Sequence, residues 1–289
     1  MTPTASPSTA SPGTDLPPAT QGDPSGRSMQ AILWGRRARL LAARLLCVLA
    51  LAGVWQYLVV SDALTPDAVA TPTQIGQALG SLMTTAEFWT PLGDTVRTWA
   101  IGLALSVLIA LPVGVLFGAS ETAYRLSRVT VDFLRTIPPV ALLPLALLLY
   151  GASARMALVL VVFGSVWPLL LQTMYGVHQI DPVTAEVARA YRLTRGQRLK
   201  VVLMPSAAPF IATGIRIAAT ISLLLAIGAE LLGGTAGLGN AISQAQQAQD
   251  MPTMYAFVVA SAFLGVALNL MMARAERRVL SWHPAHRDH

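Results

Sequence analysis

Apolar and polar residues follow one another along this chain in long blocks. Six apolar blocks are about 17 to 26 residues long, and as helices rising 1.5 Å per residue they match a hydrocarbon core of about 30 Å. The pattern predicts an all-α membrane protein with six transmembrane helices. The expected spans are Leu40–Val60, Gly93–Gly118, Leu134–Tyr150, Met156–Val177, Phe210–Leu232 and Thr253–Met272.

The third block is unusual because it contains Pro138, Pro139 and Pro144. Proline lacks a backbone donor and clashes with the carbonyl four residues earlier, so three prolines are incompatible with a straight helix. We expect a kinked span, which is tolerated where neighbouring helices satisfy the freed carbonyls. A re-entrant or loop segment is the alternative. The basic segment Glu121–Arg135 before it is expected to be a cytoplasmic connection.

Charge sets the orientation of these spans. Only 12% of the 289 residues are charged, against about 25% in soluble domains, which predicts one membrane domain with tails. Basic residues cluster at alternate connections, where the positive-inside rule places the cytoplasm. Both termini are therefore expected in the cytoplasm, and the net charge of +6 does not indicate nucleic acid as a partner. The clusters are Arg27–Arg44, Arg125–Arg135, Arg189–Lys200 and Arg274–Arg287.

Three regions follow from composition. Residues 1–35, rich in Pro, Ser, Thr and Gly, are expected to form a disordered cytoplasmic tail, residues 36–280 the transmembrane domain, and residues 281–289 a short tail. Three histidines in that last tail indicate solvated chain rather than a metal site. The single cysteine, Cys47, excludes an intrachain disulfide. We expect no metal or cofactor on this chain.

The longest polar stretch between two apolar blocks is Asp181–Pro205. Asp181-Pro182 is typical of a helix start, and Thr194 and Gln197 have the spacing of a capping box. We expect one helix ending near Tyr191 and a second from Arg195 to about Met204, stopped by Pro205. Such amphipathic helices could lie on the lipid surface or dock into a groove of a partner protein.

This stretch carries a family resemblance. Glu186-Val187-Ala188 followed by Val202-Leu203-Met204-Pro205 resembles the EAA loop of ABC-transporter permeases, whose pattern is Glu-Ala-Ala, three residues, Gly, nine residues and Ile-x-Leu-Pro. Further matches look like permeases of the nitrate/sulfonate/taurine importer group, and the likeness covers about residues 40–282. They are Pro205–Ile217, Ala229-Glu230, Gly237-Leu238-Gly239 and Ala273–Arg278.

The resemblance implies the type I ABC importer permease fold in a bacterial plasma (inner) membrane. It also implies a dimer with a second copy or a sister permease, two cytoplasmic ABC ATPase subunits and an extracytoplasmic solute-binding protein. ATP and Mg²⁺ would lie on the ATPase, because this chain lacks a P-loop motif. The residues implied in ATPase coupling are Glu186, Val187, Ala188, Arg189, Tyr191, Arg192, Leu203 and Pro205. Arg192 stands where the family has glycine.

Three ionisable residues fall within the expected spans, where they are costly and are therefore candidates for the translocation path. Arg97 and Glu230 lie near the outer ends of the second and fifth spans, and we hypothesise that they pair. Arg97 could instead extend to the membrane interface. Arg216, about two turns into the fifth span, either extends inward or lines the cavity. There it would offer an anionic cargo a charge-assisted contact.

These observations predict a transport subunit, not an enzyme. The expected function is the permease of an ATP-driven ABC importer for a small anionic solute such as a sulfonate, taurine, nitrate or a similar organic acid. One alternative is a permease of the same architecture for an aromatic acid, a pyrimidine precursor or a metal chelate. The other is an ATP-independent channel or membrane scaffold.

Overall fold

The computed structural model describes residues 43, 46–47, 49–61, 69–180 and 182–280. The chain divides into two compact units, Met1–Val54 and Trp55–His289, and the second contains the helices discussed below. In order these are α2 (Pro72–Leu82), α3 (Ala86–Gly118), α4 (Glu121–Leu134), the 3₁₀ turn η1 (Pro139–Leu142), α5 (Leu143–Tyr150), α6 (Ala154–His178), α7 (Pro182–Ala190), α8 (Arg195–Arg198), the π turn η2 (Leu199–Leu203), α9 (Met204–Gly233), α10 (Leu238–Gln247) and α11 (Met251–Val279).

The all-α class is confirmed, and the described residues contain no strand. Four helical segments are long and apolar enough to cross a membrane: α3, α6, the stretch Gly196–Gln247 that contains α9, and α11. The first expected span, Leu40–Val60, begins outside the described residues, and within it Leu49–Val60 forms a short apolar helix. The predicted tails 1–35 and 281–289 also lie outside the described residues. Six spans and two cytoplasmic termini therefore stay predictions.

Small residues set the packing of α3 on α6. A Cβ placed on Gly102 would meet Val161, one on Gly114 would meet Thr173, and one on Gly118 would meet Val177. Glycine lets two helices approach closely. All three pairs are separated by the same number of residues, so the two helices run side by side in the same direction.

This parallel arrangement corrects the bounds predicted for the third span, whose expected kink is present as a bend. Because α3 ends and α6 begins at opposite ends of the bundle, the segment between them must return across it. It does so as α4 and the shorter pair η1–α5, bent by 70° with respect to each other. Glu121–Arg135, expected to be a connection, is mostly helix and belongs to the crossing. The expected break lies just before Pro138, where two adjacent prolines cannot continue the α4 hydrogen bonds.

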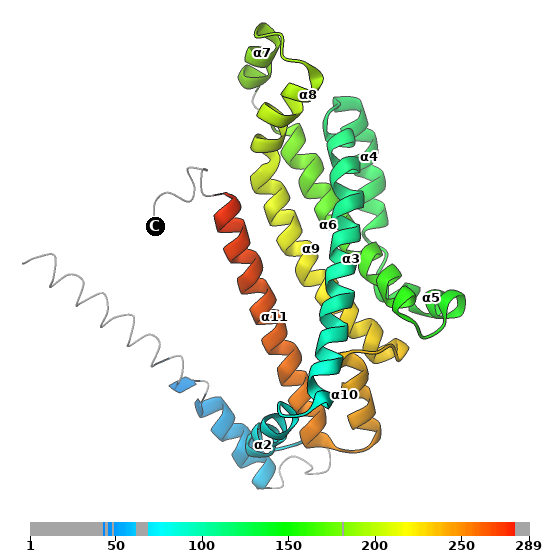
Figure 1. Cartoon of the computed structure of the whole chain (residues 1–289), viewed down its shortest axis with the longest axis vertical. Helices are drawn as coiled ribbons and strands as arrows, with labels where there is room; N and C mark the ends of the chain where they lie inside the picture. Colours follow the sequence, from blue (N-terminus) through cyan, green and yellow to red (C-terminus); the bar gives the residue numbers. More distant parts are fainter. Residues whose placement is uncertain (1–42, 44–45, 48, 62–68, 181, 281–289) are drawn as a thin grey trace, which may run out of the picture. The chain divides into compact units, whose positions relative to one another are not determined.

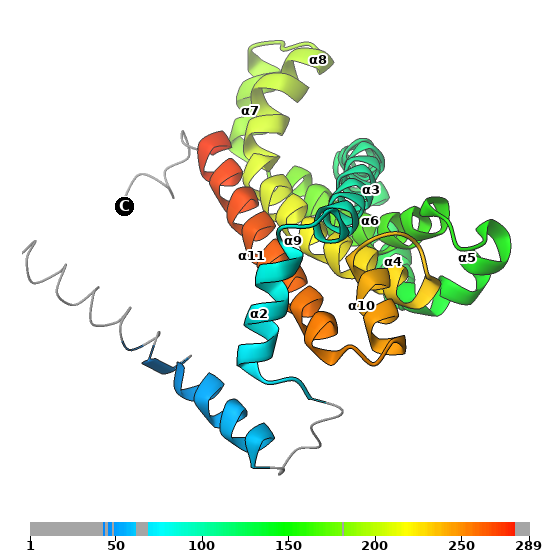
Figure 2. The same cartoon turned by 60° about the horizontal axis from the view of Figure 1, so that its bottom comes forward.

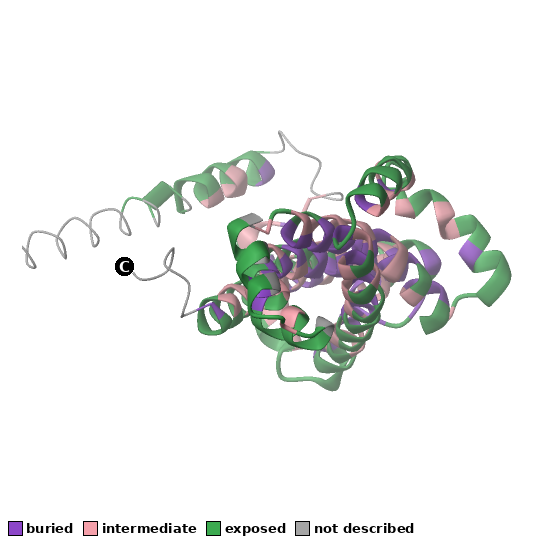
Figure 3. Cartoon of the chain, turned by 90° about the horizontal axis from the view of Figure 1, so that it is seen from above, coloured by how far each residue is buried: buried purple, intermediate pink, exposed green. Residues whose placement is uncertain are grey.

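The remaining long helices alternate in direction. Gly176 lies against Phe210 and Gly233 against Met156, so α9 runs antiparallel to α6. Arg216 reaches Asn269 and Gly265 lies near Leu223, so α11 runs antiparallel to α9. Figures 1 and 2 show α7 and α8 at one end of these helices and α10 at the other. Buried residues gather where the helices face one another (Figure 3).

Candidate coupling segment and intramembrane charges

The end of α7 depends on Arg192. This residue has φ +50°, in the left-handed region that is favourable for glycine and costs other residues about 1 kcal/mol. The Leu193 N–H donates to the Ala188 carbonyl at 3.1 Å, which is the six-to-one bond of a Schellman turn. Arginine therefore adopts the left-handed conformation that glycine would adopt at lower cost, and the turn is closed by the Leu193–Ala188 bond.

A capping box begins the next helix, as the sequence predicted. The Gln197 N–H donates to the Thr194 hydroxyl at 3.3 Å, and the Thr194 N–H donates to the Gln197 side-chain oxygen at 2.9 Å. Each side chain thus satisfies a free backbone donor of the first turn. These two turns, one at the end of α7 and one at the start of α8, therefore fix how α7 is connected to α8.

Pro205 does not stop this second helix, contrary to the prediction. α8 continues through the π turn Leu199–Leu203 directly into α9, and Pro205 lies in the first turn of α9. An α-helical proline would lack the bond to Val201 and would clash with its carbonyl. The wider π turn immediately before Pro205 accommodates both effects. α8 and the π turn therefore form one continuous rod with α9.

The predicted coupling residues divide into an exposed and a buried set. Glu186 is exposed, as are Val187 (50%) and Tyr191 (79%), whereas Ala188 is buried. Leu203 packs inward against the cluster of Val177, Ala207 and Ile211. The Arg189 side chain and Asp181 lie outside what the structure describes.

Glu230 is fully buried and does not pair with Arg97, so that hypothesis is wrong. Its carboxylate accepts a hydrogen bond from the Thr95 hydroxyl at 2.8 Å and from the Gly239 N–H at 3.1 Å. The Thr95 hydroxyl in turn accepts from the Leu238 N–H at 2.8 Å. These contacts join α3, α9 and the start of α10, which indicates a structural role for Glu230. Hydrogen bonds from the Thr95 hydroxyl and the Gly239 N–H replace the expected ion pair.

Arg97 lies instead on a separate cavity of about 420 Å³ at the α10 end. Asp94 and Thr235 share its lining, together with the turn that joins α5 to α6. The Arg97 side chain is exposed there, so its position agrees with the predicted alternative of a residue extending to the interface.

Arg216 lines a different and almost entirely apolar cavity of about 280 Å³ between α9 and α11. Its guanidinium donates to the Asn269 side-chain oxygen at 3.3 Å and lies 3.6 Å from a carboxylate oxygen of Glu276. Arg216 therefore has charged and polar partners within its own chain. The structure brings none of the three predicted intramembrane charges together.

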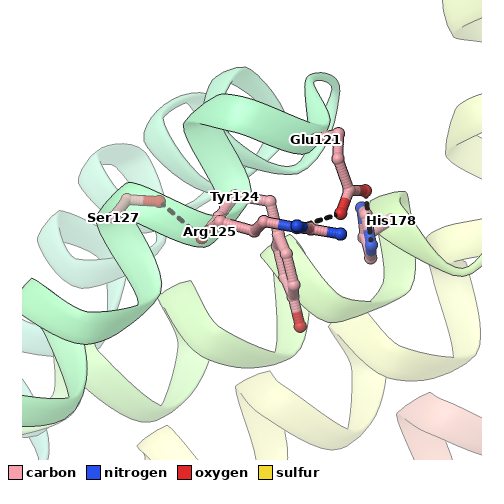
Figure 4. A network of polar contacts seen from close by, with 5 residues as sticks. All are labelled: Glu121, Tyr124, Arg125, Ser127 and His178. Atoms are coloured by element: carbon pink, nitrogen blue, oxygen red, sulfur yellow. Dashed lines mark hydrogen bonds and ion pairs between the residues drawn. The ribbon is translucent and has the colours of Figure 1, made fainter.

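Sequence reasoning named the basic cluster Arg125–Arg135 but missed that its charges share one face of the helix α4, because this segment was expected to be a connection. At its start, His178 stacks on Tyr124 with ring centroids 3.9 Å apart, and its Nε2 lies 3.3 Å from Glu121, which also pairs with Arg125 (Figure 4). Charges recurring every three or four residues were the available signal, since that spacing places them on one helix face. Within the described part of the chain, no three His, Cys, Asp or Glu side chains group as metal ligands.

Comparison with known proteins decides the family. Residues 110–281 match the family described as "Binding-protein-dependent transport system inner membrane component", which covers more than half of the chain. The chain belongs to this family. The matched region includes the bent third crossing, α7 and the whole of α9 and α11.

Curated relatives and solved structures agree with this assignment. The permease is 31% identical to the bicarbonate transport system permease CmpB of Synechococcus elongatus over 67% of this chain and 69% of that one. It is 26% identical to the nitrate import permease NrtB of Leptolyngbya laminosa over 92% and 97%. An inward-facing structure of the MetNI methionine ABC transporter matches with a TM-score of 0.58 and 21% identity, over 65% of this chain and 94% of that one. The chain is thus a multi-pass permease subunit of an ABC importer.

Proposed function

We propose that this permease forms, with a second copy or a sister permease, the path of an ABC importer for a small anion. The segment α7–η2 would be its contact with a cytoplasmic ATPase dimer, and an extracytoplasmic binding protein would deliver the solute. The basic α7 end would then lie in the cytoplasm of a bacterial cell, by the positive-inside rule.

The exposed face of α7 is the observation that carries this proposal. Val187 and Tyr191 lie four residues apart and both expose much of their side chains, with Glu186 beside them. Side chains at this spacing share one face of a helix. An exposed apolar strip next to a carboxylate, on a helix fixed by turns at its end, suits docking into a groove of a partner protein.

Continuity of the backbone supplies the mechanism. A displacement of α7 by a closing ATPase would act on α8, and α8 is joined through the π turn to α9 without a break. Leu203 links this rod to the buried cluster at the ends of α6 and α9. Movement of α9 against α6 and α3 would then open the path outward, and ATP hydrolysis would reset it.

The anionic cargo rests on the relatives and on the resemblance of the sequence. One relative is a bicarbonate permease and another a nitrate permease. Both solutes are small oxyanions. A sulfonate, taurine or a similar organic acid has the same anionic oxygens and is included in the proposal.

The test is reconstitution of the permease with its ATPase and binding protein in liposomes. Bicarbonate, nitrate, taurine and ethanesulfonate are added one at a time, and ATP hydrolysis and solute uptake are measured. We expect one anion to stimulate both activities only when the binding protein is present. Uptake that proceeds without ATP, or a permease that does not bind the ATPase, would favour a channel or scaffold.

A further inference from the structure

The helix α4 has an apolar side and a buried side. Tyr124 and Val131 are buried in the core cluster that includes residues of α6. Leu126, Val129 and Phe133 follow one another at helical spacing and are 70%, 73% and 69% exposed. The exposed apolar strip suits contact with lipid tails, in agreement with the role of α4 in crossing the membrane.

A third face of α4 is charged. It consists of Arg125, Arg128, Asp132 and Arg135, at spacings of three and four residues, and extends over about 15 Å of helix. Ionisable residues within a crossing segment face a water-filled cavity or a partner rather than lipid, because burying a charge in hydrocarbon is costly. This face is therefore expected to line an aqueous space.

Part of this face lines an open cavity of about 330 Å³ beside α6, where the charged side chains stay partly exposed. Arg128, Asp132 and Arg135 form one wall, and Gln172 and Tyr175 contribute to the opposite wall. The α6 residues lie within about 10 Å of the α7 end of that helix, at 1.5 Å per residue. The cavity thus sits near the end of the bundle that we propose faces the cytoplasm.

The charges of this cavity leave donors available. Asp132 is 3.7 Å from the Nε of Arg128 and 3.1 Å from the Nε of Arg135, so one carboxylate is shared between two guanidinium groups. The three side chains carry a net charge of +1. Each guanidinium has five N–H donors, and the Gln172 amide and the Tyr175 hydroxyl can donate as well.

We propose that this cavity binds a small anion through its oxygen atoms, as an inner subsite on the path of the transported solute. Arg128 and Arg135 would donate to the anion, since the guanidinium fork matches paired anionic oxygens. Asp132 positions both guanidinium groups and limits the affinity, so that the solute can leave. The inference rests on the proposed function, because it assumes an anionic cargo.

The experiment uses the complex of permease and ATPase in nanodiscs, without binding protein or nucleotide. Ethanesulfonate and nitrate are titrated separately by calorimetry. We expect Arg128→Gln and Arg135→Gln each to weaken binding at least tenfold, and Asp132→Asn to tighten it severalfold by freeing the guanidinium groups. Arg125→Gln is the matched control, because Arg125 belongs to the same charged face, pairs with Glu121 and does not line the cavity. It should bind within about twofold of wild type.

Three results would overturn the subsite. They are absence of binding of both probes to the wild-type complex, equal weakening by Arg125→Gln and Arg135→Gln, and weaker binding in Asp132→Asn. Even if Arg135→Gln fails to assemble, the sign of the Asp132→Asn effect still decides. Stimulation of ATP hydrolysis, measured in the same complexes after the binding protein and ATP are added, separates the two hypotheses. If stimulation persists without probe binding, only the subsite is wrong, and if both are lost, the proposed function fails as well.

A phospholipid phosphate presents similar oxygens. The titrations are therefore repeated in phosphatidylcholine nanodiscs with and without phosphatidylglycerol, and bound lipid is counted by native mass spectrometry. Probe binding in phosphatidylcholine alone supports the solute subsite. Phosphatidylglycerol retained by the wild type and lost in Arg135→Gln, with no probe binding, assigns the cavity to a lipid headgroup and overturns the proposal.

Discussion

The hydroxyl of Thr95 donates to Glu230 and accepts from the Leu238 N–H, with both distances at 2.8 Å. Both side chains are fully buried. One hydroxyl thus connects the second and fifth predicted spans to the first turn of α10. A buried carboxylate that accepts hydrogen bonds from a hydroxyl and a backbone N–H holds α3, α9 and the start of α10 together.

Thr95→Val is expected to destabilise the permease by about 2–4 kcal/mol. The change keeps the shape of the side chain but leaves one oxygen of Glu230 and the Leu238 N–H without this partner, and a buried unsatisfied group costs about 1–3 kcal/mol. Thermal unfolding in detergent measures the effect. Thr95→Ser should restore most of the stability, and Thr98→Val, one turn along α3, should be close to wild type. A Thr95→Val protein that unfolds at the wild-type temperature would contradict this role.

Gly237 and Gly234 provide a second comparison around Glu230. Both have positive φ, +149° and +68°, but a Cβ on Gly237 would collide with the Glu230 carboxylate, whereas one on Gly234 would meet nothing within 4 Å. Gly234→Ala should lower the free energy of unfolding by about 1 kcal/mol, which is the cost of the left-handed conformation alone. Gly237→Ala should reduce the yield of folded protein severely. Similar yields and unfolding temperatures for both variants would show that the Glu230 contact is unimportant.

The sequence predicted the long helices better than their connections. α6 follows its apolar block closely, and α11 contains its block and continues to Val279, because hydrophobicity over a membrane thickness is a strong signal. α4 was missed because its charged face lowered the apolar content of the segment, and only the parallel packing of α3 on α6 shows that the segment crosses. The prediction that Arg97 pairs with Glu230 was also wrong, because it was based only on the similar depth of the two residues along their spans. Depth along a span can be estimated from sequence, but the direction of a side chain around the helix depends on tertiary packing.

The coupling segment was predicted in its local details and missed in its continuity. The Thr194–Gln197 capping box is a short-range pattern, and the structure contains it. The sequence predicts a helix stop at Pro205 because an isolated proline usually ends a helix, and a π turn before it has no comparable sequence signal. Continuity between α8 and α9 is therefore visible only in the structure.

Arg192→Gly should stabilise the end of α7. Glycine removes the cost of the left-handed conformation, about 1 kcal/mol, which corresponds to about fivefold slower exchange of the Leu193 amide hydrogen. Hydrogen exchange followed by mass spectrometry measures this segment. Arg192→Ala is the control, because it keeps the Cβ and removes the guanidinium. If Arg192→Ala slows exchange as much as Arg192→Gly, the guanidinium rather than the backbone conformation determines the stability of the turn.

Glu186→Arg tests the proposed contact with the ATPase. Glu186 is exposed beside Val187 and Tyr191. A partner groove that binds this carboxylate would carry positive charge, so an arginine at the same position would be repelled. We expect the ATPase to be lost from the purified complex while the permease still inserts into the membrane. Glu87→Arg reverses an exposed glutamate at the α10 end and should leave the complex intact.

Tyr191→Ala should weaken assembly by about tenfold or more, because large aromatic side chains dominate the energetics of such interfaces. Recovery of a full complex from Glu186→Arg and Tyr191→Ala would move the ATPase contact away from α7.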